Sequence, residues 1–123
     1  MRGGFNIGLN YSLLEELHLS DDFDQPLLIG SFPVSLRVLS FGRIFNQPVL
    51  PGVLPIELTT LLFGHNFNQH LSRDNLPQNL KHLQVGNVFE QKLTPDLFPS
   101  GLVVLRISQT KYPLNYQSFP LSL

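Results

Sequence analysis

The sequence contains no cysteine, and only 14% of its 123 residues are charged. Without cysteine, the chain forms no disulfide, no zinc thiolate site and no thiol nucleophile. This composition is compatible with a reducing compartment, where disulfides are rare. We therefore expect an intracellular protein, with the cytoplasm as the default location.

A surplus of charge of one sign and a long apolar run are also missing. Lysine and arginine number 8 against 9 for aspartate and glutamate, so the net charge is -1. Such a balance offers no basic patch to a phosphate backbone or an anionic membrane surface. No run of about 18 apolar residues occurs, and no apolar stretch of a signal peptide follows Met1. We expect partners that are neither nucleic acid nor membrane.

The sequence does contain enough apolar material for a core. Apolar residues make up 42% of the chain, a share that disfavours disorder. A chain of 123 residues is expected to form one domain, spanning 1–123.

A 22-residue period runs through this domain. Leucines lead the repeats at Leu14, Leu36, Leu58, Leu80 and Leu102. A fixed period in this range is typical of a solenoid, in which each coil buries its apolar face against its neighbours. A partial coil is expected over residues 1–13. The last repeat is one residue short, because Lys111-Tyr112-Pro113-Leu114 replaces a five-residue pattern.

Each repeat opens with the pattern Leu-x-x-Leu-x-apolar, which predicts a short strand whose fourth and sixth positions face inward. Stacked strands then form a parallel sheet on one face of the solenoid. Prolines near the end of each repeat favour an irregular back side, because proline fixes φ and lacks an N–H; they are Pro33, Pro55, Pro77 and Pro99. The predicted fold is mainly β, with no more than a single helical turn on the back.

A second motif follows each strand and begins with phenylalanine. The rings are expected to stack as one core column, and the apolar residues four positions later as a second. The two positions after each ring are polar, and we interpret them as ladders that satisfy backbone groups of neighbouring coils. The rings are Phe23, Phe45, Phe67 and Phe89; the polar pairs are Asp24-Gln25, Asn46-Gln47, Asn68-Gln69 and Glu90-Gln91.

Small residues stand directly after the strands. Gly42, Gly64 and Gly86 occupy this position in the inner repeats, with Ser20 and Ser108 in the outer ones. We expect a sharp turn here with positive φ at the glycines, with close backbone packing as the alternative explanation.

These motifs resemble the FNIP repeat family, whose members are relatives of leucine-rich repeats. Phe45–Pro48 reads Phe-Asn-Gln-Pro and Phe67–Gln69 reads Phe-Asn-Gln, with the Leu-Pro and Phe-Gly signatures in register. The resemblance implies a curved, right-handed, LRR-like solenoid that makes protein contacts. It also implies a role as a recognition component, by analogy with longer family members that carry an F-box, and it brings no catalytic residues.

The sequence shows no catalytic, metal or cofactor site, so we expect no enzyme activity. His18 and His82 lie three coils apart, roughly 14 Å at ~4.8 Å per strand, too far to share a metal. His65 and His70 share one loop region but have no evident third ligand. Glu15 and Glu16 are adjacent, so strand alternation would turn their carboxylates apart.

The outward strand positions vary most between repeats, and variation is what recognition of a partner needs. We therefore predict a protein-binding face made of Glu16, His18, Val38, Ser40, Thr60, Leu62, His82, Gln84, Val104 and Arg106. Drift among tolerated surface residues would give the same variety. The alternative function is a structural or self-associating segment that stacks end to end through uncapped coils.

Overall fold

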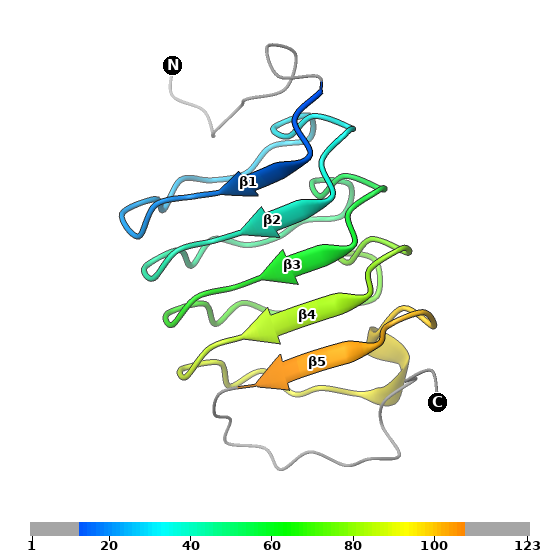
Figure 1. Cartoon of the computed structure of the whole chain (residues 1–123). Helices are drawn as coiled ribbons and strands as arrows, with labels where there is room; N and C mark the ends of the chain where they lie inside the picture. The colour runs from blue at the N-terminus through cyan, green and yellow to red at the C-terminus, as the bar shows by residue number, and fades with distance from the viewer. Residues whose placement is uncertain (1–12, 108–123) are drawn as a thin grey trace.

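The computed structural model describes residues 13–107, which form a stack of coils with five parallel strands on one face (Figure 1). Behind the sheet the chain returns to the start of the next strand, as in a right-handed solenoid. The partial coil predicted over 1–13 and the shortening near Lys111 fall almost entirely outside the described residues. The strands are β1 (Glu16–His18), β2 (Val38–Ser40), β3 (Thr60–Leu62), β4 (His82–Val85) and β5 (Val104–Ile107), in the order β1-β2-β3-β4-β5.

Every strand pairs with its neighbour at an offset of one repeat. Leu17 lies beside Leu39, Leu39 beside Leu61, Leu61 beside Leu83, and Leu83 beside Leu105. Backbone bonds outside the strands keep the same step, as where the Thr59 and Thr60 N–H groups both donate to Arg37 O at 2.9 and 3.1 Å. The predicted 22-residue register is confirmed in these coils.

The strands are short because each one contributes a single turn of the coil to the core. In β2 and β3 the central leucine is fully buried while both flanking residues are half-exposed. The lead leucines Leu36, Leu58, Leu80 and Leu102 are also fully buried. The Leu-x-x-Leu pattern therefore faces inward, as predicted.

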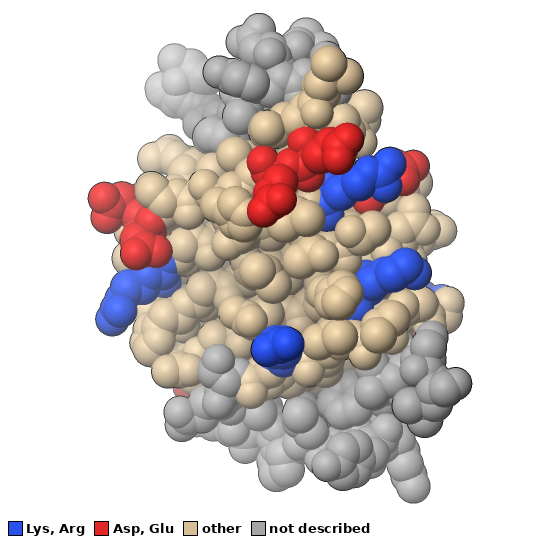
Figure 2. Space-filling model, in the orientation of Figure 1, with Lys and Arg blue, Asp and Glu red and all other residues tan. Residues whose placement is uncertain are grey.

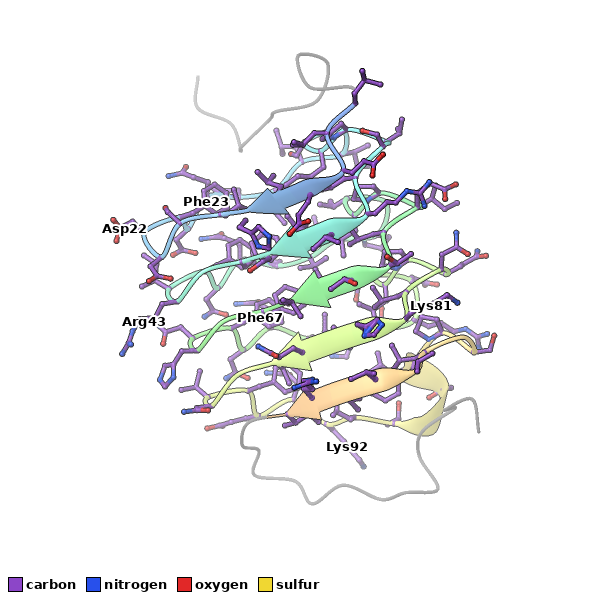
Figure 3. The ribbon with its side chains drawn as sticks, viewed as in Figure 1. Asp22, Phe23, Arg43, Phe67, Lys81 and Lys92 are labelled. Atoms are coloured by element: carbon purple, nitrogen blue, oxygen red, sulfur yellow. The ribbon has the colours of Figure 1, made fainter. Side chains whose placement is uncertain are left out.

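The core behind the sheet contains stacked phenylalanines. Phe23, Phe45, Phe67 and Phe89 form the predicted column, with successive ring centroids 5.9, 6.1 and 6.1 Å apart. Figure 3 labels Phe23 near the end of β1 and Phe67 near the end of β3. Phe63 adds a nearly parallel ring 3.8 Å from Phe67. The predicted second column is also buried at Leu27, Val49 and Leu71, with Leu93 packed against it.

The back side is irregular, as the prolines predict. Its one helical element among the described residues is the 3₁₀ turn η2 (Pro95–Leu97). In the first two coils the chain turns at Gly30 and Gly52, whose φ values are 87° and 83°. Only glycine adopts such angles without strain, so these two turns depend on it.

The predicted positive φ at Gly42, Gly64 and Gly86 is wrong. Within residues 13–107, positive φ occurs only at Gly30 and Gly52. Close packing explains the column instead, because a Cβ on Gly64 would overlap the carbonyl of Gly42, and a Cβ on Gly86 would lie 2.5 Å from Gly64 O. The glycines let the backbones of successive coils touch.

The predicted polar ladder is confirmed and has one repeating geometry. Asn68 Oδ1 accepts the Glu90 N–H at 2.8 Å and the Gln91 amide at 3.0 Å, and Gln91 also donates to Asn68 O at 3.3 Å. Asn46 receives Asn68 and Gln69 in the same way. Asp24 begins the series with a carboxylate oxygen in place of the amide oxygen. Each side chain thus satisfies donors of the following coil.

Asn68→Ala should lower the free energy of unfolding by about 1 to 2 kcal/mol, because it removes an acceptor shared by two donors on a partly exposed ladder. Asn68→Asp should keep most of the stability, since Asp24 performs the same task in the first coil. Chemical denaturation of the two variants measures the difference. Equal losses would show that the side-chain acceptor contributes nothing.

Candidate interaction surface

All ten residues predicted to bind a partner lie on the outer face of the sheet. Four of them are exposed: Glu16, His18, His82 and Arg106. The other six are half-exposed: Val38, Ser40, Thr60, Leu62, Gln84 and Val104. Their position on one face is observed, and their role in binding stays a prediction.

The centre of this face is uncharged. Val38 and Ser40 of β2 lie beside Thr60 and Leu62 of β3, as the register dictates. These four side chains are short or branched, so they lose little rotamer freedom when a partner covers them. In Figure 2, which views the molecule as Figure 1 does, this centre contains no Lys, Arg, Asp or Glu.

Charged side chains surround the centre. Figure 2 shows acidic groups towards the β1 end, a basic group towards the β5 end, and both basic and acidic groups at the sides. Glu15 and Glu16 are exposed at β1, and Arg106 is exposed in β5. Lys81 projects beside the start of β4 (Figure 3). A neutral centre with a charged rim is the usual anatomy of a protein interface.

Sequence reasoning missed the rim formed by Glu15, Arg37 and Lys81. Strand alternation places these positions on the inner side, whereas all three are exposed, because each precedes its strand. The missed signal is the Leu-x-x-Leu spacing itself. Two buried leucines three residues apart leave both intervening residues facing outward.

Two close contacts between polar side chains on this face are solvent-exposed. His18 Nε2 lies 2.5 Å from Glu16 Oε2, and both side chains are more than half exposed. Arg37 approaches Glu57 to 3.9 Å, again in solvent. Exposed pairs of this kind contribute about 0 to 1 kcal/mol, so the rim charges stay available to a partner.

The described residues offer no metal centre. No group of three His, Cys, Asp or Glu side chains within 13–107 is arranged to hold a metal ion. His18 and His82 lie in β1 and β4, with two strands between them.

A competing surface lies on the back of the first two coils. Large apolar side chains are exposed there, and the later coils hold polar residues at the same repeat positions. Leu50 is matched by Ser72, and Ile29 by Arg73. The fold therefore does not require apolar residues there, and any test of the sheet face needs a control on this back surface.

Comparison with known proteins agrees with this architecture. The family model described as FNIP Repeat matches residues 12–44, 45–88 and 67–110. No curated protein matches the chain. Among solved structures, the chain is similar to CroV588, described as a novel circular LRR protein, with a TM-score of 0.74 and 37% identity. The match covers 76% of this chain and 14% of CroV588.

No helix within residues 13–107 is long and apolar enough to cross a membrane. The 22-residue register, the Phe column and the Asn/Gln ladder coincide with the stretches that the family model matches. The chain belongs to the FNIP repeat family and has an LRR-like solenoid fold.

Proposed function

We propose that this chain is a non-enzymatic module that binds another protein through the face of its sheet. The observation that carries the proposal is the uncharged, half-exposed centre at Val38, Ser40, Thr60 and Leu62, enclosed by charged residues. FNIP repeats and LRR-like solenoids are scaffold families, and protein interaction is a typical use of the fold. Within this role, we assign the chain to a recognition component of a larger assembly.

The stacking supports the proposal because the inward strand positions form the core, whereas the outward positions can vary without disturbing the fold. The second residue of each strand faces inward and is leucine throughout, and Leu39, Leu61 and Leu83 are almost completely buried. The outward positions between them change from coil to coil without disturbing the backbone register. The sheet can therefore present any set of side chains on a rigid frame. A protein partner suits this surface better than nucleic acid, because the net charge is -1.

Leu62→Arg should abolish or strongly reduce partner binding, whereas Ile29→Arg on the back should not. Arginine already occurs at both repeat positions elsewhere in the chain. Arg106 corresponds to Leu62, and Arg73 corresponds to Ile29, each two coils later. Each variant is therefore expected to fold, which circular dichroism verifies. The experiment captures proteins on immobilised wild type and compares those bound to each variant. Loss with Ile29→Arg and retention with Leu62→Arg would assign binding to the back.

Self-association through the ends is the second candidate function. It is supported by the description of CroV588 as a circular LRR protein. The match covers only 14% of the CroV588 chain, so the matched coils are a small part of it. Analytical ultracentrifugation over a wide concentration range separates the two functions. Concentration-dependent oligomers without a captured partner favour self-association, and a monomer with a partner favours binding through the sheet.

A further inference from the structure

We infer that the sheet face selects an extended polypeptide segment lying across the strands, with a basic residue over β1, an acidic residue over β5 and uncharged residues between. The inference rests on the proposed function and specifies its partner. It is carried by the distribution of charge along the solenoid, the size of the face and the nature of its centre.

Charge is polarised along the stack. Residues 14–35 contain five acidic residues and no lysine or arginine, whereas residues 36–107 contain six basic and four acidic residues. On the face itself, Glu15 and Glu16 stand at one end and Arg106 at the other, where it lies opposite Gln84 of β4. A ligand with the opposite order of charges is attracted at both ends.

The size of the face favours a single segment over a folded domain. Five strands spaced ~4.8 Å apart extend roughly 19 Å, and three to four residues per strand give a width of about 10 to 13 Å. The product, on the order of 200 Å², is far below the ~800 Å² that each partner buries in a standard interface. An extended chain advancing ~3.3 Å per residue crosses 19 Å in about six or seven residues. The two charges of the ligand should therefore stand five or six positions apart.

The centre of the face disfavours a charge in the middle of the ligand. Val38 and Leu62 offer apolar contact there, and Ser40 and Thr60 offer only uncharged hydroxyls. A charged group covering these side chains would lose water without gaining an ionic partner. The uncharged middle separates this ligand class from uniformly charged peptides.

The experiment selects ligands for the whole chain from a random seven-residue peptide display library. Enriched peptides should carry Lys or Arg near one end and Asp or Glu near the other. A selected peptide is then synthesised with both charges, with two basic ends and with two acidic ends. The form with opposite charges should bind the wild type tightest, by roughly 5-fold over either alternative, and the difference should shrink at high salt.

Charge reversal in the protein supplies the matched test. Arg106→Glu should move the preference to the peptide with two basic ends, and the double change Glu15→Lys with Glu16→Lys should move it to the peptide with two acidic ends. Arg73→Glu on the back is the control and should change neither preference. All of these side chains are exposed, so the variants should fold.

The outcomes separate this inference from the proposed function. Peptides that lose binding with Leu62→Arg but show no charge pattern would overturn the inference and leave the sheet as the binding face. Peptides unaffected by Leu62→Arg would overturn both. A library that yields no binder would also overturn the inference, while capture of a folded partner through the sheet would still support the proposed function.

Discussion

Replacing Phe67 by alanine should destabilise the protein by about 3 to 5 kcal/mol, the range for removing a buried phenylalanine. Phe67 is fully buried and lies between Phe45 and Phe89 at 6.1 Å on either side, with Phe63 at 3.8 Å. The substitution therefore leaves a cavity inside the aromatic column. The neighbouring coils cannot close it easily, because their 22-residue register is fixed by the sheet and the ladder.

His82→Ala is the matched control, since His82 lies one coil away on the exposed face of β4. Its effect on unfolding should stay within about 0.5 kcal/mol, as for most surface substitutions. Chemical denaturation of both variants gives the comparison. Equal shifts of the two midpoints would contradict the assignment of Phe67 to the core and His82 to the face.

Much of this fold could be predicted because the residues that the structure requires recur at the same position in each repeat. The fully buried column of Phe45, Phe67 and Phe89 and the ladder through Asn46 and Asn68 recur at one spacing. Recurrence distinguishes a structural residue from a chance one even in a single sequence. Burial and hydrogen bonding were consequently predictable for the inner coils.

The roles of individual glycines and of residues just outside the strands were harder to predict. A glycine required for positive φ and a glycine required for close contact look identical in sequence. Gly52 is the first kind, and Gly64, whose missing Cβ makes room for the Gly42 carbonyl, is the second. The rim residue Lys81 was missed for a related reason, because alternation holds only inside a strand and Lys81 stands just before one.

The candidate site was the least predictable part. Inward positions repeat, so their role is visible, whereas outward positions such as Ser40, Leu62 and Gln84 differ in every coil. Repetition cannot identify a function carried by residues that do not repeat. The structure shows that residues 22 apart in sequence lie side by side in the sheet. It therefore shows which charged residues surround the uncharged centre.

The second large effect is expected for Gly64→Ala, which should destabilise the fold by about 1 to 3 kcal/mol or more, the range for overpacking a tightly packed site. The added methyl group would overlap the Gly42 carbonyl and approach Arg43 Cα to 3.2 Å, and both are backbone atoms that no rotamer change can move. Relief requires the coils to separate at this point. Separation would strain the adjacent bond between the same two coils, from Phe41 N–H to Leu62 O at 2.8 Å.

Gly101→Ala provides the control for this prediction. A Cβ there would meet only the flexible end of Lys81, at 3.6 Å, and φ is not positive, so stability should be unchanged or slightly higher. Thermal or chemical unfolding of the two alanine variants separates a steric effect from a general loss of glycine. If Gly64→Ala were as stable as Gly101→Ala, the backbones at Gly64 and Gly42 would not be in close contact. Close packing could then not explain the glycine column.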